Sequence, residues 1–329
     1  MQSFIPSAII RVMLKQNPPE QQFPKHMPVQ DWLLLVVLSI TWGISFFFIK
    51  IALHDLQPLT IVFGRVFTAA IALNFILRLR GEKLPHGWKQ WKPFLLISIL
   101  NNVLPFTLIV WSETQISSGL TSILNASAPL WGVVIAHFYN HEKLTGGKTI
   151  GILLGFGGVI VMIGYESLAG IGMNTLAQVA MLGATFCYAF AGAYTQRIKQ
   201  HSPTVIAAGQ VTISSVIMFL LMVLIDRPWL SPMPSPASLG AVLELGLVGT
   251  AVAYLLYFRI LNRSGASNAL LVTFLIPVTA LFVGIFFLGE HLSGIHFIGM
   301  GLIASGLLAI DGRALSFFKS FSRDESDTK

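Results

Sequence analysis

The chain has 329 residues, of which 54% are hydrophobic and only 11% are charged. A soluble domain carries about 25% charged residues, and a soluble chain of this length cannot bury so much apolar surface in its cores. The composition therefore excludes a soluble protein and indicates a chain whose solvent is partly lipid. The net charge of +7 does not indicate a nucleic-acid partner, because the basic residues lie in short segments between apolar runs.

Residues 1–30 differ from the rest of the chain. They are polar, they contain several prolines, and they lack the apolar middle and small-residue cleavage site of a signal peptide. We interpret residues 1–30 as a cytoplasmic tail whose composition is compatible with disorder. Whether translation starts at Met1 or at Met27 stays open.

The remaining sequence predicts ten membrane-spanning helices. A helix needs about 20 predominantly apolar residues to cross the hydrocarbon core. Such runs lie at 32–53, 59–79, 93–113, 118–140, 146–165, 174–196, 203–225, 237–260, 266–288 and 293–312.

The distribution of basic residues predicts the orientation of these spans. With the N-terminus in the cytoplasm, every Lys and Arg except Lys50, Arg65 and Arg227 falls in a cytoplasmic segment or at an adjoining helix end. This asymmetry follows the positive-inside rule. We therefore expect a multi-pass protein of the bacterial inner membrane with both termini in the cytoplasm.

The chain contains an internal repeat with an offset of 148 residues. Pro129 corresponds to Pro277, Glu142 to Glu290, and Gly151 to Gly299. Each half holds five spans, and an odd number inverts the second half relative to the first. Inverted repeats are typical of secondary transporters, which bind substrate near the bilayer midplane. The sequence thus predicts an all-α integral membrane fold of two inverted five-helix repeats, at 31–165 and 174–312, followed by a cytoplasmic tail at 313–329.

Several segments resemble a known family. The first span carries TWGISFFFIKIAL, the second carries PLTIVFGRVFTAAIAL, and both repeats end in Pro, an apolar run, Glu-x-Leu and spaced glycines. In order, spacing and duplication this pattern resembles the EamA family of the drug/metabolite transporter superfamily. The resemblance implies a ten-helix fold and export of amino acids or related metabolites across the inner membrane. It does not identify the substrate.

Two prolines lie at equivalent mid-span positions. Proline removes a backbone hydrogen bond within a helix, so we expect Pro129 and Pro277 to kink their spans beside a central cavity. A kink filled by ordinary packing is the alternative.

Polar and aromatic residues inside other spans are the candidates for substrate binding, because such side chains are costly in lipid unless they pair or contact water. They are Trp42, Ser45, Arg65, Asn101, Asn102, Trp111, Asn125, Tyr188, Gln210, Tyr254 and Asn268. For Trp111, near a span end, the sequence favours a role as an interfacial anchor.

Arg65 is the charge that lies deepest within a span. It lies in the outer half of its span, as Glu113 and Glu244 do in theirs. We expect these three residues to form an outer gate or Arg65 to hold a substrate carboxylate. Snorkelling to the headgroups or structural pairing is the alternative. We expect Glu142 and Glu290 to cap turns at helix junctions.

No enzyme motif appears in the sequence. We find no HExxH, phosphate-binding loop or nucleophile elbow, and Cys187, the single cysteine, excludes an internal disulfide. We expect no catalysis, cofactor, metal or nucleic-acid partner. A channel and a membrane-embedded enzyme without a recognisable motif stay open as alternatives. So does a homodimer, because the glycine-rich fifth and tenth spans are expected at the periphery or at a dimer contact.

Overall fold

The computed structural model describes residues 27–311 except 141, 170–171, 199 and 270. The expected tails therefore lie mostly outside the described residues. Within the described part, nine helices are long and apolar enough to cross a membrane, and Val272–Leu288 is a further apolar helix of 17 residues. The chain is an all-α multi-pass membrane protein, which confirms the predicted fold class.

The first repeat contains five crossings, two of which are interrupted. Its elements are α2 (Val29–Ala52), α3 (Pro58–Leu79), α4 (Trp88–Ser98), η1 (Ile99–Val103), α5 (Leu104–Glu113), α6 (Ser118–Asn125), α7 (Ala128–Asn140) and α8 (Gly146–Ala169). The segment η1 is a π-helical turn that joins α4 to α5 in one crossing. The helices α6 and α7 together form the next crossing.

The second repeat follows the same order. Its elements are α9 (Met173–Thr195), η2 (Gln196–Ile198), α10 (Pro203–Leu221), η3 (Met222–Asp226), η4 (Pro228–Leu230), α11 (Pro236–Gly246), η5 (Leu247–Val252), α12 (Ala253–Ser264), α13 (Ala266–Ala269), α14 (Val272–Leu288) and α15 (Gly294–Asp311). The π-helical turn η5 joins α11 to α12, as η1 joins α4 to α5.

Local sequence explains where several helices begin. Proline occupies the first turn of α3, α10 and α11, where its fixed φ suits the helix and its missing N–H is not needed. The hydroxyls of Ser202 and Ser235 accept from the backbone N–H groups of Val205 and Ser238, each at 3.2 Å. These serines therefore act as N-caps.

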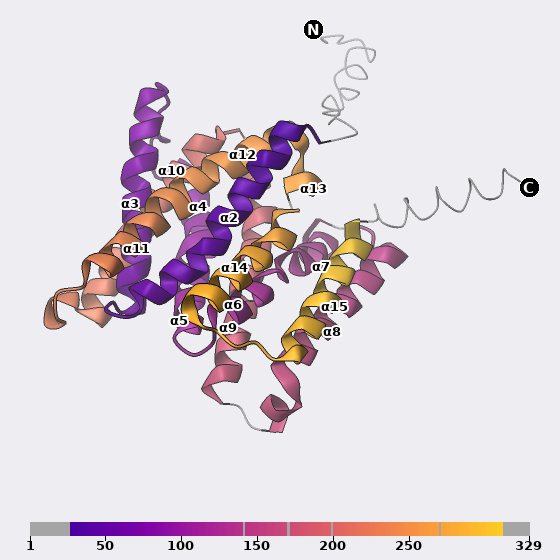
Figure 1. The fold of residues 1–329 in the computed structure, drawn as a ribbon. Helices are drawn as coiled ribbons and strands as arrows, with labels where there is room; N and C mark the ends of the chain where they lie inside the picture. The colour runs from indigo at the N-terminus through magenta and orange to yellow at the C-terminus, as the bar shows by residue number, and fades with distance from the viewer. Residues whose placement is uncertain (1–26, 141, 170–171, 199, 270, 312–329) are drawn as a thin grey trace, which may run out of the picture.

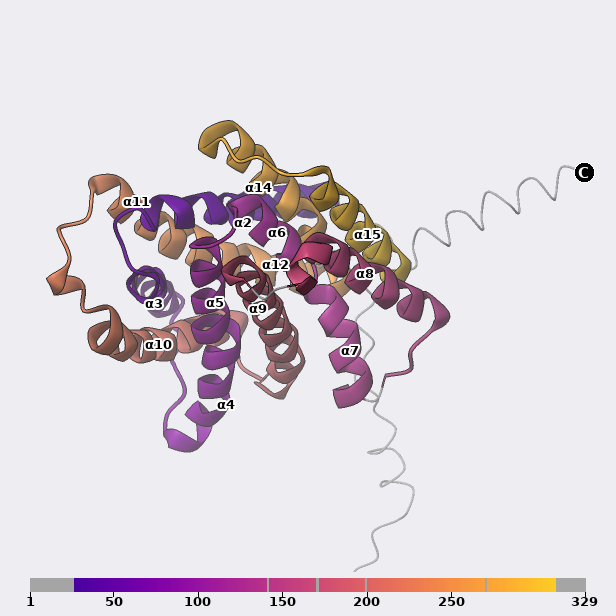
Figure 2. The same ribbon diagram turned by 90° about the horizontal axis from the view of Figure 1, so that it is seen from below.

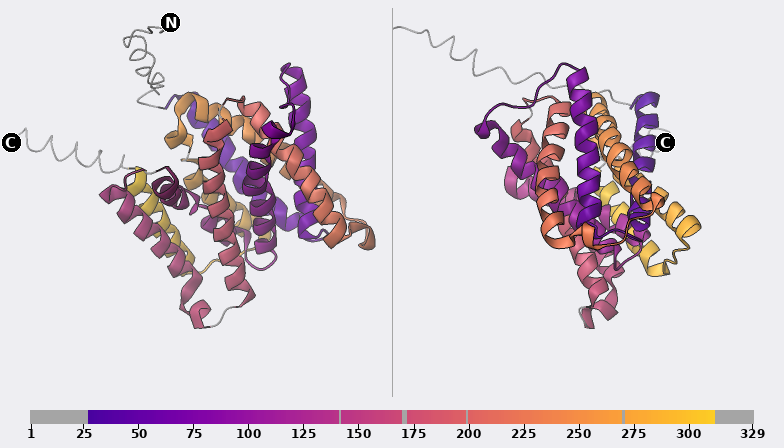
Figure 3. Two further views of the ribbon diagram at one scale, coloured as in Figure 1. Left: turned by 180° about the vertical axis from the view of Figure 1, so that it is seen from behind. Right: turned by 90° about the vertical axis from the view of Figure 1, so that its left-hand side faces the viewer.

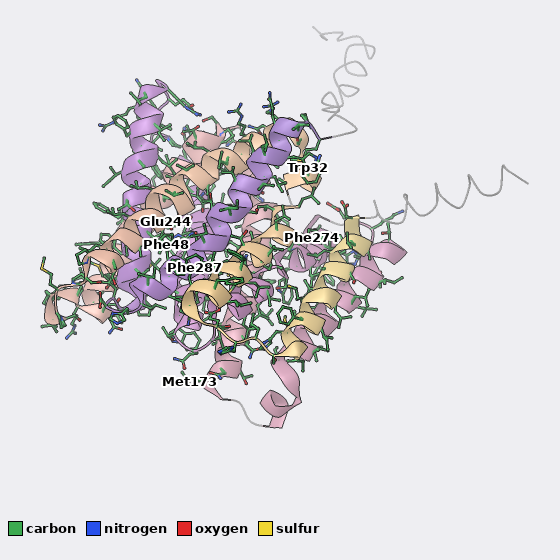
Figure 4. The ribbon with its side chains drawn as sticks, in the orientation of Figure 1. Trp32, Phe48, Met173, Glu244, Phe274 and Phe287 are labelled. Atoms are coloured by element: carbon green, nitrogen blue, oxygen red, sulfur yellow. The ribbon has the colours of Figure 1, made fainter. Side chains whose placement is uncertain are left out.

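The two sides of the bundle can be named from the chain itself. We call the side where α2 begins and α15 ends the N face, and the opposite side the distal face (Figure 1). Trp32 marks the N-face end of α2 and Met173 the distal end of α9 (Figure 4). The helix α3 extends beyond its neighbours on the N face (Figure 3).

Corresponding helices of the two repeats pack against each other. The pair α3 and α10 lies at one end of the molecule and the pair α8 and α15 lies at the other, while α5 and α9, which are not counterparts, lie between the two pairs (Figure 2). A Cβ on Gly158 would lie 2.6 Å from the carbonyl oxygen of Gly299, and a Cβ on Gly151 would lie 2.5 Å from that of Gly306. Because Gly151 corresponds to Gly299 and Gly158 to Gly306, the contacts exchange under the repeat. This exchange identifies an approximate twofold relation between inverted repeats.

The α3 and α10 pair shows the same exchange at its ends. On the distal face, the Asp226 carboxylate accepts from the backbone N–H of Thr60 at 2.7 Å and from its hydroxyl at 2.8 Å. On the N face, the hydroxyl of Ser202 donates to Glu82. The N-terminus of each helix in this pair thus lies near a carboxylate from the C-terminal end of the other helix. The positive end of the helix dipole stabilises a negative charge at this position.

Two apolar cores flank the polar residues of the interior. The larger contains Leu38, Phe46 and Met181, and the smaller contains Leu73, Phe94 and Val211. The ring of Trp42 packs against both, so α2 connects the two halves of the bundle.

Candidate functional site

The π-helical turns η1 and η5 bring polar groups into the middle of the bundle. They occupy equivalent repeat positions, because Asn101 and Asn102 lie 148 residues before Gly249 and Thr250. A π turn adds one residue to the helical repeat and is frequent at functional sites. The two turns define the candidate site.

Arg65 of α3 reaches the turn of the other repeat. Its Nε donates to Oγ1 of Thr250 at 2.9 Å, and its Nη2 donates to the carbonyl oxygen of Gly249 at 3.4 Å. Its guanidinium carbon lies 3.9 Å from the ring centroid of Phe106, which places the cation over the aromatic face. Arg65 is 6% exposed, so this charge lies within the protein and does not snorkel to the headgroups.

Gln210 of α10 reaches the turn of the first repeat. Its Oε1 accepts from Nδ2 of Asn101 at 3.0 Å. The hydroxyl of Tyr254 accepts from Nδ2 of Asn101 at 3.3 Å and from Nδ2 of Asn102 at 3.0 Å. Asn102, Gln210 and Tyr254 are all buried. The structure therefore joins four of the predicted site residues, Asn101, Asn102, Gln210 and Tyr254, in one hydrogen-bond network.

These two sets of residues are counterparts. Pairing Pro58 with Pro203 and Gly64 with Gly209 makes Arg65 the counterpart of Gln210. The 148-residue offset makes Phe106 the counterpart of Tyr254. Each half of the site thus contains a polar side chain from the second helix of one repeat, a π turn from the other repeat, and an aromatic ring.

The halves differ in charge, which determines what the site can bind. The first has the guanidinium of Arg65 and the second has the neutral amide of Gln210. A guanidinium offers several fixed donors that match a carboxylate or another oxyanion, whereas the amide half offers neutral donors and acceptors. The arrangement suits a small molecule with one anionic end and one neutral polar end.

Glu113 and Glu244 lie within electrostatic reach of Arg65. Glu113 is 1% exposed at the end of α5, and Glu244 lies on α11, which packs against α2 (Figure 4). Within the described part of the chain, Arg65 forms no ion pair with either carboxylate, and its hydrogen bonds go to η5. An outer gate made of Arg65, Glu113 and Glu244 stays a prediction.

Three other predicted residues lie around this centre. The Oγ of Ser45 donates to the carbonyl oxygen of Thr41 at 3.0 Å, and a Cβ on Gly249 would approach that Oγ to 2.6 Å. The rings of Trp42 and Tyr257 lie 5.8 Å apart. Tyr188 of α9 is within electrostatic reach of Arg65. The helices α2 and α9 thus border the site, each with one of the predicted aromatic residues.

The remaining predicted residues lie outside the two halves of the site. Trp111 packs against the larger core. Asn125 is the last residue of α6, and Nδ2 of Asn268 donates to the carbonyl oxygen of Ser264 at 2.8 Å near the N face. Their part in substrate binding stays a prediction.

The two equivalent prolines have different surroundings. The helix α6 ends at Asn125 and α7 begins at Ala128, so Pro129 lies in the first turn of a new helix. Pro277 lies inside the continuous helix α14. The fourth crossing of each repeat is therefore broken at a different point, and the role of these prolines in opening a cavity stays a prediction.

Three residues of the site were not among the predicted ones, namely Phe106, Gly249 and Thr250. Applying the 148-residue offset to Asn101 and Asn102 would have found Gly249 and Thr250. A phenylalanine in an apolar span gives no such signal. In the described part of the chain, no group of three His, Cys, Asp or Glu residues could hold a metal ion.

The chain matches the model of the EamA-like transporter family twice, over residues 31–164 and 175–310. It belongs to this family. It is 26% identical over 253 residues to the uncharacterized transporter YoaV of Bacillus subtilis, covering 76% of this chain and 87% of that protein. It is also 26% identical over 257 residues to the uncharacterized inner membrane transporter YedA of Escherichia coli, covering 76% of this chain and 80% of that protein.

Two further comparisons match most of the chain. The chain is 26% identical over 255 residues to protein PagO of Salmonella typhimurium, covering 76% of this chain and 82% of that protein. A solved crystal structure matches with a TM-score of 0.62 at 16% identity and covers 86% of this chain and 96% of its own. At this identity the likeness concerns the fold. The EamA-like chain is thus a membrane transporter by family, and its candidate site is the pair of counterpart halves around Arg65 and Gln210.

Proposed function

We propose that this EamA-like protein is a secondary transporter that exports a small metabolite, such as an amino acid or a related compound, by alternating access. The observation that carries the proposal is the buried Arg65, bonded to the π turn of the opposite repeat, while its counterpart Gln210 is bonded to the π turn of the first repeat. A binding site at the interface of inverted repeats contacts both halves, so it can open to either side when the repeats change their packing.

The proposed substrate has a carboxylate or another compact anionic group. The guanidinium of Arg65 would hold this group, and the Asn101, Gln210 and Tyr254 network would bind its polar part. Trp42 and Tyr188 would border its apolar part. This division of roles follows from the donors and rings that each half of the site presents.

The proposed setting is the bacterial inner membrane, with the N face toward the cytoplasm. The excess of Lys and Arg on that side supports this orientation, and the name of the Escherichia coli relative supports the membrane. Export, rather than uptake, is what the family resemblance implies. We propose one five-helix unit at 31–165, a second at 174–312, and a homodimer as an additional state to test.

Counterflow in proteoliposomes tests the proposal. Vesicles loaded with one unlabelled metabolite should take up the same labelled metabolite transiently, and a panel of amino acids and other small anions should reveal the substrate. The variant Arg65→Gln, which makes the two halves alike, should lose uptake of an anionic substrate at least about tenfold, because a charge-assisted hydrogen bond contributes about 1.5–3 kcal/mol. Wild-type counterflow by Arg65→Gln would refute the assigned role of Arg65. Flux that does not saturate and shows no counterflow would favour a channel.

A further inference from the structure

Glu113, the last residue of α5, has a buried carboxyl group that forms no hydrogen bond in the described part of the chain. The residue is 1% exposed, and neither Oε1 nor Oε2 has a partner among the described residues. An ionised carboxylate without partners is very costly in an apolar interior, and such a group takes up a proton instead. The geometry therefore suits a neutral, protonated carboxyl group at the distal end of α5.

Two carboxylates on the same face are bonded as anions. The Glu290 carboxylate accepts from the backbone N–H groups of Ser118 at 2.7 Å and Gly119 at 2.9 Å. The Asp226 carboxylate accepts from the backbone N–H and the hydroxyl of Thr60. Hydrogen bonds of this kind favour the ionised form of a carboxyl group. The carboxyl group at the end of α5 lacks them, so it differs in kind from these two.

The second repeat has an apolar residue at the position of Glu113. The 148-residue offset makes Leu261 its counterpart, and Leu261 packs against the larger core. The fold therefore accepts an apolar side chain at this point of the third crossing, and packing does not require a carboxyl group there. An ionisable residue inside a membrane protein is by default a candidate for function.

Two cations and one anion lie within electrostatic reach of Glu113, namely Lys50 of α2, Arg65 of α3 and Glu290 of the α14–α15 connection. The other elements that pack against α5 are α6, η1 and α9. Of these, α6 and η1 contain no titratable residue, and α9 contains only a cysteine and two tyrosines. The two cations are therefore the groups to which an ionised Glu113 would turn.

Lys50 is bonded to the main chain of Glu113 and not to its carboxyl group. Its Nζ donates to the carbonyl oxygen of Glu113 and, at 2.7 Å, to that of Ile116. These carbonyl groups lie at the C-terminal end of α5, where a cation is favoured. Lys50 thus holds the α5–α6 connection, although a carboxylate on the same residue would bind its ammonium group more strongly than a neutral carbonyl group does.

We propose that Glu113 is a proton-binding site, and that its proton decides whether Lys50 holds the α5–α6 connection on the distal face. With the proton bound, Lys50 binds the carbonyl groups, which is the arrangement in the structure. When Glu113 releases the proton to water, its carboxylate takes the ammonium group of Lys50, which stays protonated, and the connection is freed. This inference deepens the proposed transport, on which it rests, by naming a proton as the coupling ion.

Infrared difference spectroscopy of the full-length protein in lipid nanodiscs tests the proton site. A protonated carboxyl group has a C=O stretching band that a carboxylate and an amide lack. The spectrum of the wild type minus that of Glu113→Gln should contain this band at about pH 6, where an ordinary glutamate is ionised. Asp226→Asn removes a carboxylate with donors, so its difference spectrum should lack the band. Absence of the band from the Glu113→Gln difference would overturn the proposal.

A distance between spin labels, measured by double electron–electron resonance, tests the switch. Gln115→Cys in the connection and Ser231→Cys before α11 are at exposed positions and are combined with Cys187→Ala. The distance distribution should shift between about pH 6 and about pH 9, because buried glutamates titrate up to about pH 8–9. Glu113→Gln cannot form the anion, so it should keep the low-pH distribution at both values. An equal shift in Glu113→Gln would refute the role of its proton.

Lys50→Met separates the switch from the proton site. Methionine keeps an unbranched side chain but has no ammonium group, so the distance distribution should be that of the freed connection at both pH values. The infrared band of Glu113 should persist. Lys143→Met, at an exposed lysine near the N face, is the matched control and should alter neither measurement. A normal pH response in Lys50→Met would show that Lys50 does not hold the connection.

Neither measurement needs a substrate, so this inference and the proposed function can fail separately. A Glu113 band with a pH-dependent distance, but without counterflow by the wild type for any tested metabolite, would support the proton site and refute the transport proposal. Counterflow by a wild-type protein that lacks the band would refute the proton site alone.

Discussion

Nε of Arg65 donates to Oγ1 of Thr250 at 2.9 Å, across the boundary between the two repeats. Thr250 in turn donates to the carbonyl oxygen of Leu245 at 2.8 Å, so its hydroxyl is fixed as an acceptor for the guanidinium. The hydrogen bond from Nε of Arg65 thus depends on the hydroxyl of one threonine in a π turn. This relation leads to the first prediction.

Thr250→Val should reduce counterflow about tenfold or more. Valine keeps the shape of threonine but leaves a buried cationic donor without its acceptor, which costs about 1.5–3 kcal/mol. Thr250→Ser retains the hydroxyl and should keep most of the activity. Equal counterflow by the valine and serine variants would show that the hydroxyl does not position Arg65.

Tyr254→Phe should lower the thermal stability of the purified protein and weaken substrate binding. The change removes the hydroxyl that accepts from Asn101 and Asn102 and leaves a buried amide donor unsatisfied, at a cost of about 1–3 kcal/mol. The ring itself should fit, because Phe106 is the counterpart residue in the first repeat. A melting temperature in detergent equal to that of the wild type would contradict the network.

Gly158→Ala should destabilise the protein, whereas Gly157→Ala should not. A Cβ at Gly158 would lie 2.6 Å from the carbonyl oxygen of Gly299, and a Cβ at Gly157 would meet nothing within 4 Å. Backbone cannot move aside as easily as a side chain, so α8 and α15 would have to separate at a cost of about 1–3 kcal/mol, typical of overpacking. The two neighbouring variants, compared by thermal unfolding in one detergent, form a matched pair. Equal melting temperatures would argue against close packing of these helices.

The carboxyl of Asp55, on the distal face, should become protonated only in strong acid. The side chains of Ser235 and Ser238, followed by His54, donate to Asp55 and hold the pKa of its carboxyl well below the ordinary value. A depressed pKa means that the contact contributes its full stability above the unfolded pKa of about 3.9 and loses it as the pH falls toward the folded pKa. The melting temperature of Asp55→Asn should therefore lie below that of the wild type by a constant amount from pH 8 to pH 5. The difference should shrink below about pH 4, and a difference that already shrinks between pH 7 and pH 5 would contradict this assignment.

The sequence predicted the fold class because apolar length and the repeat offset depend only on the order of residues. It also named Arg65, Asn101, Gln210 and Tyr254, since a polar side chain within an apolar span is costly wherever it points. It could not show that Arg65 and Gln210 are counterparts, because the second helices align with a different offset from the fourth and fifth. The π turns were equally hidden, since ILNNV and LVGTAV share no pattern of residues.

Local breaks in the fourth crossing depend on tertiary contacts. The sequence placed Pro129 and Pro277 at the same point of each repeat, yet one begins a helix and the other lies within one. Identical prolines in different packing give different backbones, because neighbouring helices decide which hydrogen bonds can be replaced. The contact of Glu290 with the start of α6 likewise has no signature in one linear sequence.

The glycine contacts of α8 and α15 have a consequence for how such a chain can be assembled. A surface that fits against its own inverted copy needs nothing from the connection between the halves. Two separate five-helix chains, inserted in opposite directions, could form every contact that the single polypeptide makes between α8 and α15. Fusion into one polypeptide frees the halves to diverge, so that one can keep a cation where the other has an amide.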